Sequence, residues 1–338
     1  MAGTNKPDML TTSARTILVT GAAGFIGSST AIRLIERGDH VVGLDNLNDY
    51  YDPARKRINL ADVNAAAEGN GKFTFIEHDI RDRPRVAELF AQHSFDGVVH
   101  LAAMAGVRPS VDDPWLYYEC NLTGTLNLLD ATHRFGNPNF VFASTSSAYG
   151  NTTLVPFIET DTADRPLSPY PASKRAAELL GHSYHHMQGV DFTALRFFTV
   201  YGPRGRPDMM AYKIFEAMRT DAPMPLFNGG NMYRDWTFVD DIVSGIVAAV
   251  DRRLGYEVLN IGRGEPVLLA DFIKSFEKLA GKKAPMTSEP MMKADVSYTF
   301  ANIDKAKSLL GYDPKVSVAE GVRRFYDWYR SAVGDPGA

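Results

Sequence analysis

Cysteine is almost absent from this sequence, because its 338 residues include a single one, Cys120. One cysteine cannot form a disulfide within the chain, and such usage suits a reducing cytoplasm. A strong charge imbalance is absent too, since 36 lysines and arginines stand against 40 aspartates and glutamates, for a net charge of −4 at pH 7. This balance lacks the positive footprint of a nucleic-acid-binding protein. We therefore expect a cytoplasmic protein with no nucleic-acid partner.

Long hydrophobic runs are also missing. No segment reaches the ~20 apolar residues that a membrane-spanning helix needs, and the N-terminal residues lack the apolar stretch of a secretion signal. We expect no membrane partner, and flexible tails at residues 1–14 and 331–338. His182, His185 and His186 fall on a predicted helix without an acidic partner at metal-ligand spacing, so we expect no metal site.

The chain does contain a regular alternation of short apolar runs and helix-like segments. The runs are typical of strands that are covered on both faces, and their alternation with helices predicts an α/β fold built on a Rossmann-type, doubly wound parallel sheet. Ligands of such a sheet bind at the carboxyl ends of its strands. The predicted strands are 16–19, 40–44, 73–76, 97–101, 140–143, 193–196 and 257–261. The predicted helices among them are 28–37, 83–93, 121–134, 174–187 and 240–252.

A glycine loop separates the first predicted strand from the first predicted helix. Gly21 permits a tight turn, Gly24 lets the backbone approach a pyrophosphate, and Gly27 lets the helix pack closely on the sheet. The N-terminus of that helix offers free N–H groups to phosphates. The alternative is a purely structural turn, and the surrounding strand, helix and following acid argue against it.

That acid is Asp45, which follows the second strand, 18 residues after Gly27. A carboxylate there would accept hydrogen bonds from both hydroxyls of an adenosine ribose and repel a 2′-phosphate, which favours NAD over NADP. Asp79 and Ile80 end the third strand, where the adenine would rest. The alternative for Asp79 is a loop cap.

Tyr170 and Lys174 carry the most informative spacing in the chain. Residues four apart on a helix lie one turn from each other, so the ammonium can lie close to the phenol. A positive charge there would lower the phenol pKa from about 10, and such a phenol could take a proton from a sugar hydroxyl near neutral pH. Thr145, which follows a buried strand, can share that proton. The alternatives are an exposed helix start and an ordinary loop hydroxyl.

These features together resemble a known family. The chain is similar to the extended short-chain dehydrogenase/reductase enzymes that act on nucleotide sugars, and within them to the UDP-glucuronate 4-epimerases. The glycine loop and the Thr145, Tyr170 and Lys174 set mark the wider group. Three further segments are more specific, and the resemblance extends from about residue 15 to residue 330. Those segments are 48–52, 105–108 and 196–209.

The resemblance implies a bound NAD and two domains. The NAD-binding Rossmann domain would comprise residues 15–197 and 236–262, and a smaller, discontinuous α/β UDP-sugar-binding domain would comprise 198–235 and 263–330. It also implies a homodimer. The implied cofactor contacts are Gly21, Gly24, Phe25, Ile26, Gly27, Asp45, Asn46, Asp79, Ile80, Leu101, Ala102, Ala103, Asn121, Tyr170, Lys174 and Phe197.

The resemblance also implies a set of substrate contacts. Thr199, with Ser146 and Ser147, would give neutral donors to a sugar carboxylate, and Arg206 and Arg234 would pair with the diphosphate. Asp295 matches the family's nucleoside-binding acid, and Arg108 completes the set. The alternative for each arginine is a solvated surface charge, and for Asp295 a turn.

Small differences separate the branches of this family. Related dehydratases and decarboxylases carry acids after the catalytic threonine or nearby, where this chain has Ser146 and Ser147. We therefore expect reversible C4 epimerisation of UDP-glucuronate to UDP-galacturonate through a 4-keto intermediate. A UDP-glucose 4-epimerase, a UDP-glucuronate decarboxylase and a catalytically idle NAD-binding protein remain alternatives. The chain departs from the usual family residues at Met104, Ala148 and Met292.

Overall fold

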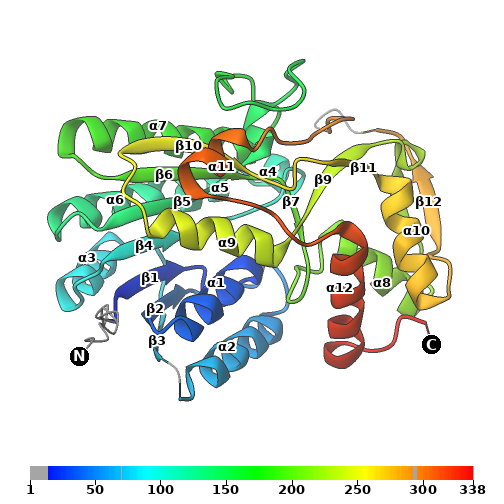
Figure 1. The fold of residues 1–338 in the computed structure, drawn as a ribbon, viewed down its shortest axis with the longest axis horizontal. Helices are drawn as coiled ribbons and strands as arrows, with labels where there is room; N and C mark the ends of the chain where they lie inside the picture. Colours follow the sequence, from blue (N-terminus) through cyan, green and yellow to red (C-terminus); the bar gives the residue numbers. More distant parts are fainter. Residues whose placement is uncertain (1–13, 70, 292–294, 338) are drawn as a thin grey trace, which may run out of the picture.

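A seven-stranded parallel sheet forms the centre of the computed structural model, which describes residues 14–69, 71–291 and 295–337 (Figure 1). The strand order is β10-β6-β5-β4-β1-β2-β3. The chain therefore reverses direction across the sheet at β1, whose neighbours are β2 and β4. The strands are β1 (Thr16–Thr20), β2 (His40–Asp45), β3 (Lys72–Glu77), β4 (Gly97–His100), β5 (Asn139–Thr145), β6 (Phe192–Phe197) and β10 (Tyr256–Ile261).

Helices cover both faces of this sheet. Helix α1 (Phe25–Glu36) contacts both α2 (Pro53–Ala67) and α9 (Val239–Val250) on one face, and α6 (Gly124–Arg134) contacts both α3 (Arg83–Gln92) and α7 (Pro169–Gln188) on the other (Figure 1). The central strands are apolar because both of their faces are buried, as in β4 and β5. The fold class predicted from the sequence is confirmed.

Local signals start and stop these helices. The Asp52 and Asp82 side chains accept hydrogen bonds from backbone N–H groups in the first turns of α2 and α3, and each helix has proline near its start. Helix α7 begins at a proline and ends at Gly189 in the left-handed conformation. Short helices α4 (Pro109–Asp112) and α5 (Pro114–Tyr118), with the π-helical turn η1 (Glu119–Thr123), precede α6.

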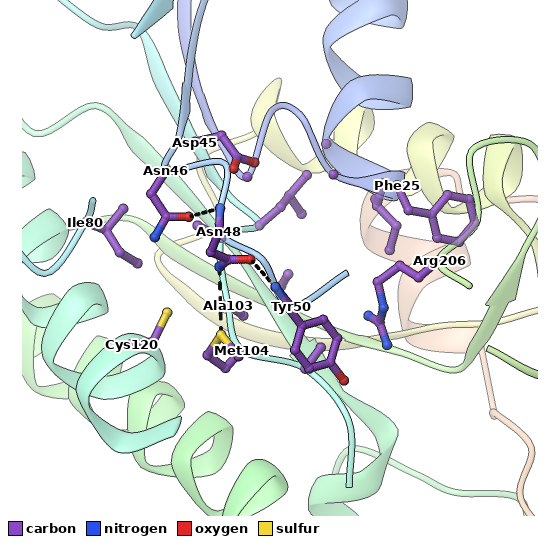
Figure 2. Close-up of a pocket in the computed structure, with 18 of the residues that line it drawn as sticks. Phe25, Asp45, Asn46, Asn48, Tyr50, Ile80, Ala103, Met104, Cys120 and Arg206 are labelled. Carbon is purple, nitrogen blue, oxygen red and sulfur yellow. Dashed lines mark hydrogen bonds between the residues drawn. The ribbon is translucent and has the colours of Figure 1, made fainter. Parts of the chain in front are cut away.

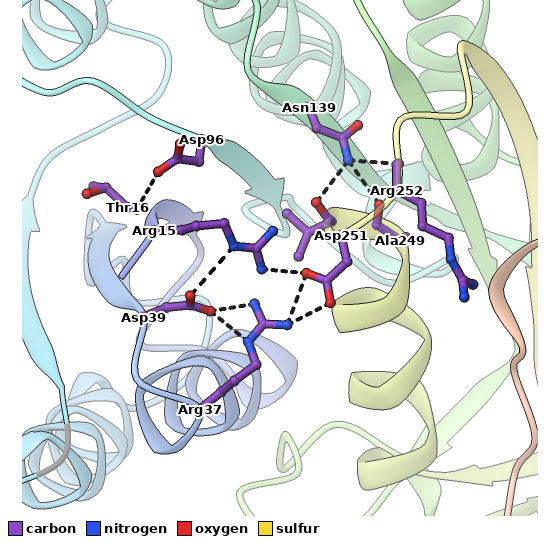
Figure 3. Close-up of polar contacts among 10 residues, drawn as sticks. Arg15, Thr16, Arg37, Asp39, Asp96, Asn139, Ala249, Asp251 and Arg252 are labelled. Carbon is purple, nitrogen blue, oxygen red and sulfur yellow. Dashed lines mark hydrogen bonds and ion pairs between the residues drawn. The ribbon is translucent and has the colours of Figure 1, made fainter. Parts of the chain in front are cut away.

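A polar cluster fastens the amino-terminal side of the sheet. Arg15 and Arg37 both contact Asp251, which follows α9, and both contact Asp39, which precedes β2 (Figure 3). Asn139, at the start of β5, donates to three backbone carbonyls at the end of α9 and just beyond it. These contacts lie opposite the carboxyl edge, so they hold the scaffold without entering a site there.

The rest of the chain builds a smaller assembly beside the carboxyl edge, at the right of Figure 1. One three-stranded sheet joins β7 (Thr199–Tyr201), β9 (Tyr233–Phe238) and β11 (Pro266–Leu268), and β8 (Met224–Phe227) pairs with β12 (Met286–Glu289). Trp236 stacks on Phe272 with ring centroids 3.8 Å apart. The remaining elements are η2 (Ser146–Tyr149), α8 (Met210–Thr220), η3 (Asn228–Gly230), α10 (Leu269–Ala280), α11 (Asp304–Leu310) and α12 (Val318–Ala332).

Several boundaries differ from the sequence-based expectation. Helix α7 begins at Pro169 instead of residue 174, which places Tyr170 in its first turn. Helix α2 was not predicted at all, because Lys56 and Asn59 lie among its buried residues and blur the apolar pattern. Residues 331 and 332, predicted to be tail, belong to α12. The predicted tail before residue 14 and the family departure at Met292 lie outside the described residues.

No helix in the described part of the chain is both long and apolar enough to cross a bilayer.

Gly181 gives a test of how α7 packs on the sheet. Glycine within a helix usually costs about 1 kcal/mol relative to alanine. Here a Cβ would lie 2.4 Å from the buried Phe192 ring, which is stacked between Phe140 and Tyr256. We therefore expect Gly181→Ala to destabilise the protein by about 1–3 kcal/mol through overpacking, measured as a lower urea midpoint. Ser183→Ala, exposed on the same helix, is the control, and stabilisation by Gly181→Ala would contradict this packing.

Candidate active site

The glycine loop between β1 and α1 is packed too tightly to accept side chains. A Cβ on Gly27 would lie 1.9 Å from the Gly21 carbonyl oxygen, and one on Gly21, whose φ is +71°, would lie 2.8 Å from the Ala102 nitrogen. The N-cap residue of α1 is Gly24, so no side chain caps the helix. The first-turn N–H groups of α1 therefore face the carboxyl edge of the sheet, where an anion can accept from them.

Asp45 ends β2 beside this loop. Its two carboxylate oxygens accept from the backbone N–H groups of Leu47, at 2.9 Å, and Ala23, at 3.2 Å. Lys56 lies 3.5 Å from the same carboxylate and donates to the Asn48 side chain at 2.9 Å. These contacts fix the direction of the carboxylate, and the position is where the sequence predicts the contact with an adenosine ribose.

Asp79 follows the adjacent strand β3. It accepts from the Asn46 amide at 2.8 Å and from Arg81, and although burial opposes the shift, these hydrogen bonds lower its pKa to about 2. Its neighbour Ile80 is buried against Gly124, where a Cβ would lie 2.6 Å from the isoleucine side chain. The end of β3 thus presents a fixed carboxylate and an apolar surface side by side.

A pocket runs along the carboxyl ends of β1, β2 and β4, and most of the predicted cofactor residues line it. Figure 2 shows Asp45, Asn46 and Ile80 in one part of this pocket and Phe25 and Arg206 in another. Predicted residues in its wall are Gly21, Gly24, Phe25, Ile26, Gly27, Asp45, Asn46, Asp79, Ile80, Leu101, Ala102, Ala103, Tyr170, Lys174 and Phe197.

Asn121 is the predicted cofactor residue that lies outside this wall. It is fully buried in η1, and its side chain exchanges hydrogen bonds with the Met104 backbone and donates to Ser173. Ser173 in turn donates to the Tyr170 carbonyl. Asn121 therefore supports the loop after β4 and the start of α7, which form part of the wall.

Lys174 shows that the pocket suits a polyhydroxylated ligand such as a dinucleotide. Its side chain is buried on α7, and its ammonium lies 4.1 Å from the centroid of the Phe142 ring. Within the part of the chain that the structure describes, the Nζ atom has no hydrogen-bond partner. A buried ammonium without acceptors is costly. Ribose hydroxyls at this point of the pocket would supply them. Together with the glycine loop and Asp45, this unpaired donor fits NAD.

Tyr170 differs from the expectation in one respect. The spacing predicts that the Lys174 ammonium lowers the phenol pKa. Instead, burial raises the pKa of Tyr170, while the charge of Arg206 and a hydrogen bond with Thr145 oppose the increase. Burial also lowers the pKa of Lys174 to about 7. The ammonium lies over Phe142 and the aromatic face attracts it there, so helical spacing alone does not direct it onto the phenol.

A second pocket adjoins the first where β5 ends and α7 begins. Ser144 and Tyr170 line the first pocket, and Ser146 and Pro171 line the second, so Thr145 stands between the two. Thr145 is buried and accepts from the Ser147 N–H at 3.1 Å. Of the predicted substrate residues, Ser146, Ser147, Thr199, Arg234 and Asp295 line the second pocket.

The arginines around these pockets have different surroundings. Arg234 donates to the Tyr233 carbonyl and the Met232 sulfur, and burial lowers its pKa while the charge of Asp295 opposes the decrease. A partly buried guanidinium with only neutral hydrogen-bond partners is suited to a phosphate. Arg206 instead lines the first pocket and pairs with Asp208, both of its hydrogen bonds measuring 2.9 Å.

Arg108 lines neither pocket. Its guanidinium lies 3.2 Å from Asp295 and 3.9 Å from the centroid of the Phe227 ring. It thereby joins the loop after β4 to two segments of the smaller assembly, at the border of the second pocket.

Sequence reasoning assigned no part in the first pocket to Tyr50, Tyr51 and Lys56, which all line it. The two tyrosines lie in a segment that marks the family resemblance, which is a signal that could have identified them. Lys56 gave no signal, because a lysine on an unpredicted helix is indistinguishable from a surface residue. Met104, one of the departures from the family residues, also lines this pocket, where its sulfur lies 3.9 Å from the Asn48 amide.

Comparison with known proteins agrees with this geometry. Residues 17–262 match the model of the NAD dependent epimerase/dehydratase family. The chain belongs to this family. UDP-glucuronate 4-epimerase of Thermodesulfobacterium geofontis is 42% identical over 94% of this chain and 96% of its own length. UDP-glucuronate 4-epimerase 4 of Arabidopsis thaliana is 41% identical over 94% of this chain and 75% of its own length.

Solved structures of family members have the same fold. UDP-glucuronic acid 4-epimerase from Bacillus cereus, in complex with UDP-glucuronic acid and NAD, has a TM-score of 0.85 at 36% identity and covers 94% of this chain and 99% of its own. UDP-glucose 4-epimerase from Thermotoga maritima, with UDP-glucose, also has a TM-score of 0.85, at 33% identity over 94% of this chain and 99% of its own. For this chain, the predictions of an NAD-dependent epimerase and of NAD as its cofactor are confirmed.

Asp45 provides a test of the cofactor pocket. A hydrogen bond to a charged group contributes about 1.5–3 kcal/mol and one to a neutral group about 0.5–1.5 kcal/mol, so loss of the charge weakens each bond to a ribose hydroxyl by about 1 kcal/mol. We expect Asp45→Asn to bind NAD roughly 10-fold to 100-fold more weakly in calorimetric titration. Glu77→Gln is the matched control, because Glu77 is the register partner of Asp45 on β3 and is exposed. Equal NAD affinity of Asp45→Asn and wild type would place the ribose elsewhere.

Proposed function

We propose that the protein interconverts UDP-glucuronate and UDP-galacturonate by reversible epimerisation at C4 through a 4-keto sugar. The observation that carries the proposal is the meeting of the two pockets at Thr145 and Tyr170. A sugar in the second pocket would present its C4 hydroxyl to these two side chains, and its C4 hydrogen to the first pocket. The names of the relatives and of the Bacillus cereus structure support the same substrate.

NAD, when bound, supplies the hydride acceptor and donor that C4 chemistry requires. The chain's own part is proton transfer and positioning. In this proposal Tyr170 takes the proton of the C4 hydroxyl, with Thr145 sharing the hydrogen bond, and returns it after the sugar has presented its other face. Lys174 lines the same pocket, where its ammonium would donate to the ribose hydroxyls of the cofactor and so hold the cofactor beside the phenol.

The second pocket offers groups for each part of the substrate. Arg234 is suited to the diphosphate because its hydrogen-bond partners are neutral. Asp295, which lines the same pocket, would bind the nucleoside. Ser146, Ser147 and Thr199 would donate to the C6 carboxylate. Arg108 and Arg206 also belong to the proposed substrate contacts. Arg206 would reach the substrate from the wall of the first pocket, and Arg108 would act by holding Asp295, with which it forms an ion pair.

The three neutral donors Ser146, Ser147 and Thr199 separate this proposal from its alternatives. The fold alone does not exclude a UDP-glucose 4-epimerase, since one such enzyme shares it. A neutral hydroxymethyl group does not need three neutral donors, whereas a carboxylate accepts from all of them. A decarboxylase would need the C5–C6 bond aligned with the π system of the 4-ketone so that carbon dioxide can leave. No acid follows Thr145 to assist related eliminations.

We extend the proposal to the domain division and the assembly. Residues 15–197 and 236–262 carry the seven-stranded sheet, and 198–235 with 263–330 carry most of the smaller sheets, which supports two domains. Exposed apolar side chains on the neighbouring helices α6 and α7, Leu126, Leu179 and Met187, support a homodimer. The single cysteine and the composition support a cytoplasmic location.

Substrate preference is the experiment that tests this function. Buried donors left without an acceptor cost about 1–3 kcal/mol each, so we expect kcat/KM for UDP-glucuronate to exceed that for UDP-glucose by about 10²–10⁴-fold. NMR of the reaction mixture should identify UDP-galacturonate. Equal efficiency on both sugars, or UDP-pentose as the main wild-type product, would overturn the assignment.

Thr199→Ala tests whether the Thr199 hydroxyl donates to the C6 carboxylate of the substrate. The change removes one donor, so we expect kcat/KM for UDP-glucuronate to decrease by roughly 10-fold, as loss of about 1.4 kcal/mol implies. Turnover of UDP-glucose, which has no carboxylate, is the internal control and should change little. A UDP-4-keto-pentose by-product in the mass spectrum would show a loosened carboxylate. Equal losses on both sugars would remove Thr199 from carboxylate recognition.

Tyr170→Phe tests the proton transfer. Removing the hydroxyl should leave binding of NAD and UDP-glucuronate intact and reduce kcat by about 10²–10⁴-fold, the usual contribution of a positioned acid–base group. Calorimetry measures the binding and product NMR measures the rate. A variant that keeps more than about a tenth of the wild-type rate would exclude Tyr170 from proton transfer.

A further inference from the structure

Helix α7 carries a second buried charge one turn beyond Lys174. Glu178 is fully buried, and its carboxylate accepts two hydrogen bonds from Arg196, at 3.0 and 2.7 Å, and one from Arg175, at 3.1 Å. It also accepts from the Ser144 hydroxyl at 2.5 Å. Ser144 directly precedes Thr145, and Arg196 directly precedes Phe197 in the wall of the first pocket.

The Glu178 carboxylate affects the charge of Lys174, as the surroundings of that lysine show. Burial is the main reason why its pKa falls, and two groups oppose the decrease, the Cys120 thiolate and Glu178. Burial raises the pKa of the Cys120 thiol, so that group is uncharged near neutral pH. Glu178 is then the remaining negative charge that supports the ammonium. Glu178 lies one helical turn from Lys174 on α7, and both side chains are buried, where charges interact more strongly than in water.

The other titratable groups around Lys174 do not replace Glu178. On β4, His100 is fully buried, and burial lowers its pKa well below the usual value, which keeps it neutral. On α7, Tyr170 is a neutral phenol in its protonated form. On β6, Arg196 is positive and would repel the ammonium if Glu178 did not pair with it.

We propose that Glu178 is a positioning residue of the active site, whose buried negative charge stabilises the Lys174 ammonium one helical turn away and whose hydrogen bonds fix the strand ends beside Thr145 and Phe197. The inference deepens the proposed function and rests on it for the importance of Lys174. A purely structural ion pair is the competing explanation, because buried pairs also hold elements together. The two explanations differ in whether removing the charge alters the titration of Lys174.

The direct test is an NMR pH titration of Lys174 in the NAD-loaded protein. The resonance of ¹³Cε-labelled lysine at this position is assigned by its loss in Lys174→Met. Glu178→Gln keeps the shape and removes the charge, so we expect the pKa of Lys174 to fall by about one unit or more. At a pH equal to the wild-type pKa, that shift reduces the charged fraction from about a half to about a tenth.

Two variants serve as controls. Glu178→Asp keeps the charge and should leave the pKa of Lys174 near the wild-type value. Arg175→Gln removes a positive partner of the same carboxylate and should not lower the pKa of Lys174. An unchanged Lys174 titration in Glu178→Gln would overturn the proposal and leave a structural pair.

A second readout uses turnover. Because the charged ammonium is the active form, loss of the Glu178 charge should shift the alkaline limb of the kcat profile to lower pH by about one unit. A structural defect alone would reduce kcat equally at every pH and would contradict the proposal. If the wild type fails to epimerise UDP-glucuronate, the proposed function is wrong, while the NMR titration still decides the effect of Glu178.

Glu178→Gln leaves Arg196 buried without its charged partner and can prevent folding. In that case the double variant Glu178→Gln/Arg196→Met removes both charges. This variant is compared with Arg196→Met, which keeps the Glu178 charge, and the proposal predicts a lower Lys174 pKa in the double variant than in Arg196→Met. Equal Lys174 pKa values in these two folded variants would contradict it.

Discussion

A buried lysine without a hydrogen-bond partner is the constraint around which this active site is built. An ammonium taken out of water and left unpaired costs several kcal/mol, and Lys174 lies over the face of Phe142 without a hydrogen-bond partner among the described residues. The protein reduces that cost in two ways. It places Glu178 one turn away, and it leaves a pocket in which ribose hydroxyls can approach the ammonium. The vacant hydrogen bonds of Lys174 thus couple the cofactor site to the catalytic helix.

The sheet determines where the other groups meet. Its direction reverses between β1 and β4, so the loops that follow these strands diverge and open the first pocket. Strand β5 ends at Thr145 and α7 begins at Pro169, and between them they bring the threonine and Tyr170 to the border of the second pocket. The smaller assembly closes that pocket from the other side with Thr199, Arg234 and Asp295. The proposed reacting groups therefore come from two elements, Thr145 from β5 and both Tyr170 and Lys174 from α7.

The sequence predicted the parts of this arrangement that local pattern controls. The buried strands are continuous apolar runs, and the glycine loop and Asp45 follow two of them at a characteristic spacing, so much of the wall of the first pocket could be anticipated. Tyr50, Tyr51 and Lys56 in the same wall were missed. Tertiary contacts decided the rest. From the sequence alone Glu178 cannot be distinguished from a surface acid, because its ion pair with Arg196 of β6 forms only in the folded chain. The direction of the Lys174 ammonium depends on Phe142, and the Arg108–Asp295 contact joins segments 187 residues apart.

The central claim is that the cofactor and the sugar share one closed reaction space at Thr145 and Tyr170. Deuterium at C4 of UDP-glucuronate tests it most directly. If the hydrogen removed from C4 returns to C4 within the same site, UDP-galacturonate formed in ordinary water will retain the deuterium, as seen by NMR and mass spectrometry. Replacement of that deuterium by solvent hydrogen during epimerisation would contradict the account.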